Sequence, residues 1–466
     1  MFFFLLLMHS SQLSCSPHIF FTYSFLNTTG LVRTGVAPDH PEVKQVTADF
    51  ETVATDPRFS FLGNVRVGTD VSVAELRTLY DGVILAYGAS SDRGMGIPGE
   101  ELNNVCSARA FVNWYNGHPD FRNFAPNLDA EDVVIIGQGN VAIDCARVLC
   151  KTPAELADTD IASHAFDALS RSKVKRVHVV GRRGHVQAAM TMKELREVTR
   201  LADCSFHVST EELARGRTAA SMTETETARA KKRMDALLAE QAKLEAAAAP
   251  KRSRQLFLRF LLQPHSCLPS ATDAKSVGSF AFDVTALEGE ADKQSAKVSG
   301  KKETIQAGLV LKSIGYKSMP LPGVPFDDRR AVVRNVKGRV VNDAAGDEPE
   351  AGLYCAGWLK RGPTGIVGTN ITDARETVAC LLEDRAAGRL PARNRSSSSP
   401  SALAIFRGML VSKGMKREHL VPWEGWRRLD ELELKAGKEK GKSREKFVVV
   451  ADMLNEVEKI EMKEVA

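Results

Sequence analysis

A short apolar run that leads into a glycine-rich turn and then a helix constrains the fold of this 466-residue chain most strongly. The run is residues 133–136, and the turn that follows contains Gly137, Gly139 and Ala142. Gly137 can adopt backbone angles closed to other residues, and Gly139 leaves no side chain between the main chain and a pyrophosphate. Ala142 lets the helix pack closely on its strand, and the N-terminus of the helix offers unpaired N–H groups to phosphates. The pattern predicts a dinucleotide-binding turn, with an ordinary glycine-rich loop as the alternative.

The next strand indicates which nucleotide the turn accepts. We expect it at residues 174–180, and it is followed by Gly181, Arg182 and Arg183. In NAD-binding units an Asp or Glu at this position accepts hydrogen bonds from the ribose hydroxyls. Two guanidinium groups favour the additional 2'-phosphate of NADP instead, because charge-assisted hydrogen bonds contribute about 1.5 to 3 kcal/mol each. The sequence therefore predicts NADP, with a solvated basic turn as the alternative.

Composition excludes several other classes of protein. The formal net charge of +5 is small for this length and argues against a nucleic-acid partner. The eight cysteines include no C-x-x-C pair and no metal-ligand spacing, so we predict a reduced compartment, no redox disulfide and no metal. Residues 1–32 contain no charged residue, and their apolar runs at 1–8 and 19–26 are shorter than the roughly 20 residues of a membrane span. Because targeting peptides need basic residues, we expect no clear targeting signal here.

Periodicity predicts alternating helices and strands along the rest of the chain. Residues 223–248, rich in Ala, Lys, Glu and Arg, are expected to form a solvated helix, with a disordered segment as the alternative. Residues 352–388 should form a strand, a glycine-rich loop and a helix, and residues 30–44 a loop. Further helices are expected at 43–54, 73–80, 108–116 and 448–465, and further strands at 64–68, 81–90, 256–262, 280–287 and 309–314.

We find no convincing set of residues that would polarise a carbonyl substrate, neither a Ser with a Tyr-x-x-x-Lys motif nor a group of metal ligands. The hydride acceptor is therefore expected to be a bound flavin. Eight stretches together resemble the adrenodoxin reductase family, the mitochondrial-type NADPH:ferredoxin reductases. They are "GLVRTGVAPDHPEVK", "IPGEE", "CSARAFVNWYNG", "GQGNVAIDCARVL", "VVGRRG", "KELRE", "SIGYKS" and "GLYCAGWLKRGPTGIVGTN". The resemblance begins at Gly30 and continues nearly to the C-terminus.

The resemblance implies an α/β fold of two Rossmann-like, three-layer domains. An NADP-binding domain, residues 92–315, would be inserted in an FAD-binding domain formed by residues 30–91 and 316–466, and residues 1–29 would be an atypical apolar segment. Hydride would pass from NADPH to FAD, and single electrons would then pass to a [2Fe-2S] ferredoxin. The resemblance further implies a monomer in the mitochondrion, without a membrane span, and is compatible with peripheral association at the inner mitochondrial membrane.

The resemblance also assigns cofactor-binding residues. The pyrophosphate of NADP would lie on the turn that holds Gly137, Gln138, Gly139, Asn140 and Val141, its 2'-phosphate on Arg182 and Arg183, and Glu194 of "KELRE" would contact the same cofactor. The residues assigned to FAD are Leu31, Val67, Trp358 and the backbone of Gly365, Ile366 and Val367. The helix after "GPTGIVGTNITD" would direct its N-terminus at the flavin ring, and Gly365 would also approach the nicotinamide.

Five further residues are assigned by resemblance to catalysis or to partner binding. His40 and Asp144 are similar to the polar pair near flavin and nicotinamide; the alternatives are a Pro-flanked turn histidine and an ordinary helix carboxylate. Arg196, Arg229 and Arg233 stand where the family binds its acidic ferredoxin. A solvated basic face is the alternative for these arginines, and a solvated helix carboxylate for Glu194.

The sequence departs from the family before Gly30. The family opens with a strand, a G-x-G-x-x-G turn, a helix and a second strand ending in Glu, whereas residues 1–29 contain no Gly and no acidic residue. We expect the neighbouring strands to be left with exposed edges. Two explanations stay open: residues up to Thr29 replace the natural start, or the chain is a truncated NADP-binding remnant without flavin or activity. A flavoprotein disulfide reductase is disfavoured because it needs a redox-active cysteine pair.

Overall fold

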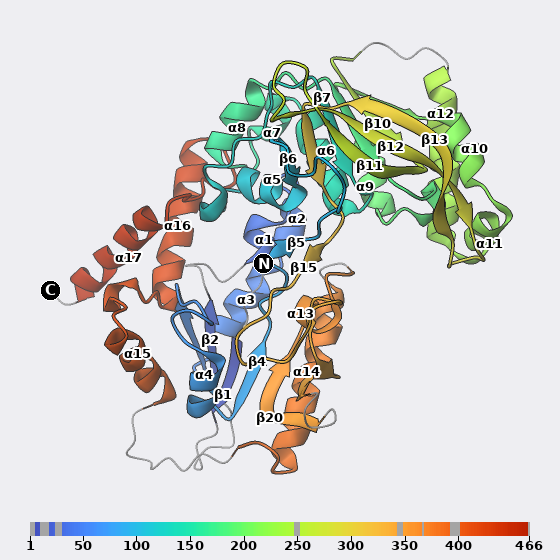
Figure 1. Ribbon diagram of the computed structural model, residues 1–466. Helices are drawn as coiled ribbons and strands as arrows, with labels where there is room; N and C mark the ends of the chain where they lie inside the picture. Colours follow the sequence, from blue (N-terminus) through green and yellow to red (C-terminus); the bar gives the residue numbers. More distant parts are fainter. Residues whose placement is uncertain are drawn as a thin grey trace.

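The computed structural model describes residues 5–9, 18–23, 30–246, 252–342, 348–365, 368–391 and 401–464. These residues form two α/β parts, each built on its own sheet, which lie one above the other in Figure 1. A six-stranded sheet carries the glycine turn, and a seven-stranded sheet contains the strands nearest both ends of the chain. The expected α/β class with two dinucleotide-binding layouts is confirmed by this architecture.

The six-stranded sheet is parallel throughout. Its central strands are largely apolar and buried because helices cover one face and a second sheet covers the other, as parallel sheets require. In spatial order they are β6 (Val105–Ser107), β14 (Leu309–Lys312), β7 (Asp132–Ile136), β8 (Arg176–Val180), β10 (Arg254–Arg259) and β9 (Cys204–Val208). The helices of this part are α5 (Ala108–Tyr115), α6 (Asn140–Cys150), α7 (Pro153–Leu156), α8 (Ser163–Ser170), α9 (Met192–Val198), α10 (Thr210–Gly216), α11 (Ala219–Thr227) and α12 (Arg229–Ala246).

The third layer of this part is an antiparallel sheet. Its strands are β11 (Leu262–Pro269), β12 (Val277–Glu288) and β13 (Ser295–Gln306). Phe280 and Phe282 of β12 pack with Val134 and Val180 of the parallel sheet, so side chains of the two sheets share one core. This layer fixes the parallel sheet from the side opposite its helices.

The departure from the family that the sequence predicts lies in the seven-stranded sheet. Its order is β18 (Asn335–Val336), β19 (Arg339–Asn342), β20 (Glu348–Cys355), β4 (Gly82–Leu85), β1 (Leu5–His9), β2 (His18–Tyr23) and β3 (Phe59–Gly63). β1 runs antiparallel to both β4 and β2, so the two strands do not form a strand, helix, strand unit. The expectation of exposed edges is wrong, because β1 and β2 pair with the edges of β4 and β3.

Helices of the second part lie around this sheet and along one side of the molecule, where α15, α16 and α17 are drawn in red (Figure 1). None of the helices in the described ranges is both long and apolar enough to cross a bilayer. The helices are α1 (Leu31–Thr34), α2 (Pro41–Lys44), α3 (Thr47–Ala54), α4 (Val73–Leu79), α13 (Trp358–Arg361), α14 (Thr369–Ala386), α15 (Ala402–Ser412), α16 (Trp423–Glu439) and α17 (Val450–Glu464).

These bounds correct two sequence expectations and bear on a third. The strand expected at 64–68 lies instead at Phe59–Gly63, because Asn64 has a left-handed φ of 62° and ends it. The expected loop at 30–44 contains α1 and α2. The charged stretch from 223 is the end of α11 followed by α12, so the part of it that the structure describes is helical, as predicted. The expectation that this helix is solvated is wrong for one of its faces, because Met234, Leu238 and Ala242 of α12 are buried in the core.

The chain passes between the two parts through two short strands that lie side by side. β5 (Ser91–Asp92) pairs antiparallel with β15 (Tyr316–Lys317), and both labels lie between the two sheets in Figure 1. A separate two-stranded pair, β16 (Phe326–Asp327) with β17 (Val332–Val333), follows. The predicted domain boundaries at 91/92 and 315/316 fall within the first pair and stay a prediction.

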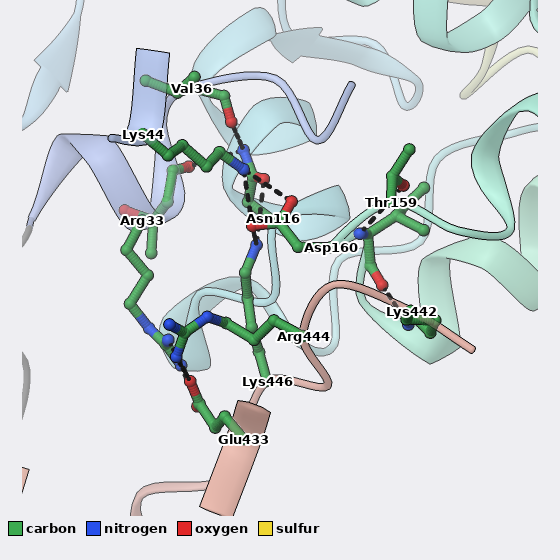
Figure 2. Close-up of polar contacts among 12 residues, drawn as sticks. Arg33, Val36, Lys44, Asn116, Thr159, Asp160, Glu433, Lys442, Arg444 and Lys446 are labelled. Carbon is green, nitrogen blue, oxygen red and sulfur yellow. Dashed lines mark hydrogen bonds and ion pairs between the residues drawn. The ribbon is translucent and has the colours of Figure 1, made fainter. Parts of the chain in front are cut away.

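Buried ion pairs also connect the two parts, at a place other than β5 and β15. Asp160, which precedes α8, accepts hydrogen bonds from Lys44 at 2.6 Å and forms an ion pair with Lys446 at 3.0 Å (Figure 2). Figure 2 also shows Arg33 and Arg444 converging on Glu433 of α16. Because the Lys446 side chain is fully buried, desolvation lowers its pKa to about 7, against the nearby negative charge of Asp160.

Candidate functional site

The turn between β7 and α6 has the shape that a pyrophosphate requires. Gly137 has a φ of 117°, and a Cβ there would lie 2.2 Å from the carbonyl oxygen of Ser313, so a side chain cannot be accommodated. A Cβ on Gly139 would have no described heavy atom within 4 Å, so the approach to its backbone is open. Gly139 is also the N-cap of α6, and the first N–H groups of the helix therefore face this open space.

The two predicted phosphate-binding arginines directly follow the strand beside this turn. A Cβ on Gly181 would lie 2.1 Å from Oε1 of Gln138, so the end of β8 touches the turn itself. Arg182 and Arg183 come next, and both are exposed. Arg183 donates only a long 3.4 Å bond to a backbone carbonyl, and no ion pair is found for either guanidinium within the described ranges. This position and exposure suit an added phosphate.

The other turn residues hold the surrounding backbone. Gln138 donates from Nε2 to the carbonyl oxygen of Arg259 at 2.7 Å, which joins the turn to β10. Asn140 accepts at Oδ1 from the backbone N–H of Thr191, the N-cap of α9, at 2.9 Å. Val141 is half-buried and packs against the core of this part. Of these three, Gln138 and Asn140 act as local braces whatever ligand is present.

Three predicted site residues, His40, Asp144 and Glu194, converge on one guanidinium, that of Arg147. Arg147 lies on α6 with its side chain 2% exposed, and it donates to Asp144 at 2.7 Å and to Glu194 at 2.9 Å. Nδ1 of His40 lies 3.5 Å from Nη2 of the same guanidinium. Asp39 completes the ring of partners, with Nε of Arg147 2.7 Å from its carboxylate. The structure thus brings His40 and Asp144 together, as expected, through a residue that the sequence reasoning missed.

The charges in this network are unequal. Four carboxylates, those of Asp39, Asp144, Glu194 and Glu197, face three cations, Arg147, Lys151 and Lys193. Burial raises the pKa of both Asp144 and Glu194, although Arg147 opposes the shift. Burial also works against ionisation of Asp39, but hydrogen bonds and charge from Arg147 and Lys151 prevail and hold its pKa below the usual range. Asp144 and Glu194 are therefore the groups in this site most ready to hold a proton.

A metal ion is not assigned to this cluster. The ligand atoms of His40, Glu194 and Glu197 lie within 4.8 Å of one another, a spacing that could hold a cation. Nη1 of Arg147, however, lies 2.9 Å from Glu194 and 3.3 Å from Glu197, so a guanidinium already occupies the position between the carboxylates. The prediction that the chain binds no metal stays a prediction.

A cavity of about 260 Å³ lies where the resemblance places the flavin. Leu31 and Gly35 line it from the first segment and Tyr316 and Trp358 from the later one, the two rings being 5.7 Å apart. Nε1 of Trp358 is buried and has no hydrogen-bond partner among the described residues. A buried N–H without an acceptor is costly, so an acceptor brought within reach of Trp358 would stabilise this side chain.

Two further residues assigned to FAD, Val67 and Gly365, are not among the residues that line this cavity. Val67 is buried in the core of the seven-stranded part and is not among the residues that line the cavity. Gly365 has a φ of 83°, and a Cβ there would lie 2.5 Å from Oγ1 of Thr369 at the start of α14. Ile366 and Val367 lie outside the described residues. Their assigned roles stay predictions.

The three arginines predicted to bind the partner are all exposed. Arg196 lies on α9, two residues from Glu194 of the Arg147 network. Arg229 and Arg233 lie four residues apart in α12 and so share one face of that helix. Exposure is necessary for binding an acidic partner, but it also fits a solvated basic face.

Arg147 is the functional candidate that the sequence analysis did not find. It is part of the quoted stretch "GQGNVAIDCARVL" and lies three residues after Asp144. An arginine on the otherwise apolar face of an amphipathic helix, one turn from a carboxylate, is the available signal, because burial of a guanidinium requires acidic partners. Asp39 and Glu197 could then have been recognised as those partners only through the fold.

Comparison with known proteins agrees with this geometry. The family described as "Pyridine nucleotide-disulphide oxidoreductase" matches residues 9–211. Mitochondrial NADPH:adrenodoxin oxidoreductase of Arabidopsis thaliana is 45% identical over 435 residues, covering 91% of this chain and 87% of that protein. The corresponding protein of Homo sapiens is 44% identical over 431 residues, covering 91% and 84%.

A solved structure extends the similarity to the whole fold. FprA of Mycobacterium tuberculosis in complex with NADPH superimposes with a TM-score of 0.83 at 36% identity, covering 94% of this chain and 92% of that chain. The identity and coverage are high enough to settle membership, and the sequence resemblance is therefore confirmed. The chain belongs to the NADPH:adrenodoxin oxidoreductase family.

Proposed function

We propose that this protein is an FAD-dependent NADPH:ferredoxin reductase, which takes a hydride from NADPH onto FAD and passes single electrons to a [2Fe-2S] ferredoxin. One observation carries the proposal. The segment that lines the cavity at Leu31 and Gly35 continues to His40, and there it meets α6, the helix that begins at the nucleotide turn. The segment that lines the cavity thus meets the helix that begins at the nucleotide turn, which supports a path for hydride between two cofactors bound at these two places.

The residues present fit both cofactors. For NADP, the open backbone at Gly139 and the exposed Arg182 and Arg183 would hold the pyrophosphate and the 2'-phosphate. For FAD, Leu31, Tyr316 and Trp358 would line the cavity, and Tyr316 would exclude water from one side. When bound, a flavin accepts a hydride and releases electrons one at a time, whereas a nicotinamide exchanges only hydride.

Within this proposal the domains are those expected from the sequence. Residues 92–315 would bind NADP, and residues 30–91 with 316–466 would bind FAD. The six-stranded sheet lies wholly within the first range, and the paired strands β5 and β15 lie where the ranges meet.

The test is anaerobic reduction of the purified, flavin-loaded chain. NADPH should bleach the oxidised flavin absorption, and a [2Fe-2S] ferredoxin added next should be reduced at the expense of NADPH. NADH at the same concentration is the matched control and should act much more slowly. Flavin reduction without any electron transfer to the iron-sulfur protein would overturn the ferredoxin part alone, and no flavin reduction would overturn the whole.

A second candidate is NADP binding without bound flavin. It is favoured by residues 1–29, which contain none of the glycines that hold the pyrophosphate of FAD in the family, and by the antiparallel pairing of β1 with β4. The visible spectrum of the protein freed of loose flavin separates the candidates. Absorption near about 380 and 450 nm, a property of oxidised flavins, supports the reductase, and its absence supports the second candidate.

Location and assembly belong to the same proposal. The two relatives compared above are named as mitochondrial, and we propose the same compartment for this chain. We also propose a monomer that associates peripherally, if at all, with the inner mitochondrial membrane. Cell fractionation with a carbonate wash, and light scattering on the purified protein, test these statements separately.

A further inference from the structure

Residues 181–184, here called the arginine turn, carry the two arginines predicted to bind the 2'-phosphate. The carbonyl oxygens of its first and third residues accept hydrogen bonds from the backbone N–H groups of Leu262 at 3.0 Å and of Leu261 at 3.1 Å. The carbonyl oxygen between them, that of Arg182, accepts from the hydroxyl Oγ1 of Thr285 at 2.7 Å. The corner between β10 and β11, together with β12, therefore anchors the backbone of the turn at three consecutive carbonyls.

The peptide N–H groups of the arginine turn point away from these anchors. In a trans peptide the C=O and the N–H of one unit point in opposite directions, and the carbonyls of residues 181–183 all point at the anchors. No acceptor is found for the N–H groups of Arg182, Arg183 and Gly184 among the residues that the structure describes. Successive backbone N–H groups left free by a turn bind anions. Beside two exposed guanidinium groups, they suit a phosphate.

Of the three anchors, Thr285 is the one that acts through its side chain. Thr285 is 2% exposed, and its own backbone N–H donates to the carbonyl oxygen of Leu261 at 2.8 Å. Leu261 has a left-handed φ of 58°, which is rare for a bulky residue, and uses its N–H for Arg183 and its carbonyl for Thr285. Such a conformation persists only where surrounding contacts hold it. The corner is thus a fixed support for the turn.

The buried side of β12 changes at Thr285. Phe282 and Val284 are buried in the core that β12 shares with the parallel sheet. Directly after them the alternation breaks, because Thr285 is also buried and Ala286 is exposed. The pairing of β12 with β13 shifts register at the same place, between Asp283 and Thr285. Irregular strand pairing is a common means of aiming a side chain at a particular group, here the carbonyl of the arginine turn.

We propose that Thr285 is a positioning residue for the nucleotide: its hydroxyl fixes the carbonyl of Arg182 and so directs the free N–H groups and both guanidinium groups of the arginine turn toward the 2'-phosphate of NADPH. Thr285 acts through the turn and thereby contributes to the preference for NADPH over NADH. The inference deepens the proposed function, because it rests on the placement of the 2'-phosphate at Arg182 and Arg183. It concerns nucleotide binding alone and needs no bound flavin.

Thr285→Val tests the proposal, because it removes the hydroxyl and keeps the size of the side chain. The carbonyl of Arg182 then loses its donor, and this peptide unit is free to rotate. We expect NADPH to bind on the order of tenfold more weakly, about the effect of one hydrogen bond, whereas NADH should bind as before. Dissociation constants of both nucleotides, measured by titration of the purified chain, give the preference. An unchanged preference would overturn the proposal.

Two further variants distinguish positioning from a merely structural role. Thr285→Ser keeps the hydroxyl and should keep the preference. Thr377→Val is the matched control, because Thr377 is also buried and its Oγ1 donates to the carbonyl oxygen of Cys355 at 3.0 Å in the other part of the molecule. It should lower the melting temperature and leave the preference unchanged. An equal loss of NADPH and NADH binding in Thr285→Val, or a loss of preference in Thr285→Ser, would count against the proposal.

Hydrogen exchange in the unaltered protein tests the same arrangement without a substitution. At saturating concentrations, NADPH should slow exchange of the N–H groups of residues 182–184 more than NADH does, because only NADPH carries the 2'-phosphate. Equal protection by the two nucleotides would show that these groups do not bind it.

Arg182→Ala and Arg183→Ala separate this inference from the proposed function. If they lower the preference for NADPH and Thr285→Val does not, the placement of the 2'-phosphate stands and the positioning role fails. If neither arginine variant lowers it, the placement is wrong and the inference fails with it. If Thr285→Val lowers the preference in a protein whose bound flavin NADPH does not reduce, the proposed function fails and the positioning role stands.

Discussion

At the scale of single residues, two positions of one turn need glycine for different reasons. Gly137 is required by the fold, because its φ is 117° and a side chain would meet the carbonyl oxygen of Ser313. Gly139 has an ordinary φ of −91° and open space around it, so nothing in the described protein requires glycine there. The demand for Gly139 comes from the ligand.

Alanine substitution should separate these two demands. Gly137→Ala should destabilise the protein by roughly 1–3 kcal/mol, the cost of a non-glycine residue in a strained conformation. Gly139→Ala should leave the melting temperature almost unchanged but weaken NADPH binding about tenfold or more, because the methyl group stands where the pyrophosphate approaches. Thermal unfolding and a binding titration measure the two effects. Equal loss of stability in both variants would contradict this reading of the turn.

The arginines at the end of β8 define a second experiment at this scale. Replacing Arg182 and Arg183 with Ala should weaken NADPH binding by about ten- to a hundredfold for each arginine, because each can form charge-assisted bonds to the 2'-phosphate. NADH lacks that phosphate and should bind as before. Dissociation constants of both nucleotides measure the ratio. A similar loss for NADPH and NADH would place the 2'-phosphate elsewhere.

Single residues also show where sequence reasoning stops. The requirements at Gly137 and Gly139 are local, so the turn and its chemistry could be predicted from a few neighbouring residues. Arg147 could not be assigned a role in this way, because its partners lie as far away as Asp39 and Glu197. The role of Val67 stays a prediction that rests on the family match alone, since the contacts described for this residue are those of the core.

At the scale of elements, strands buried on both faces were the easiest to predict. β7 is apolar after its first residue, β8 contains three valines, and each strand is followed by a glycine, which leaves little choice of structure. β13 was missed because most of its residues are exposed and polar, so the strand carries no period of two in hydropathy. The pairing of β1 and β2 with β4 and β3 was missed because pairing of edges is decided by backbone geometry and not by the side chains of residues 1–29.

One element, α12, offers a test of partner binding. Arg229→Glu and Arg233→Glu should weaken binding of an acidic ferredoxin, and the loss should shrink as salt is raised, because screening reduces charge attraction between exposed groups. Flavin reduction by NADPH should not change. Arg427→Glu, at an exposed position of α16, is the matched control and should have little effect. If the α12 variants bind ferredoxin as tightly as the unaltered protein, the arginines are a solvated face.

At the scale of the whole molecule, the buried ion pair of Lys446 and Asp160 should make the stability of the protein depend on pH. Burial lowers the pKa of Lys446 from 10.5 to about 7. Between these values the unfolded chain holds a proton that the folded chain has released, so the free energy of unfolding should rise with pH across this window. Lys446→Met should remove that part of the rise.

Urea unfolding at several pH values between 7 and 10 measures the slope. The difference between the unaltered protein and Lys446→Met cancels the other groups that titrate in this range. Lys438→Met, at an exposed position of α16, is the control and should keep the slope of the unaltered protein. The same slope in Lys446→Met would show that Lys446 keeps its proton in the folded state.

The adjacent strands β5 and β15 have a consequence for how such a chain can arise and be rebuilt. Ser91 stands opposite Lys317, and facing residues of antiparallel strands are about 5 Å apart, so everything between them leaves and returns at nearly one point. If a gene segment were inserted or deleted at this point, β5 and β15 would stay where they are. A linker of a few residues in place of that stretch would reconnect the remaining chain, and the excised segment could be closed on itself into a ring.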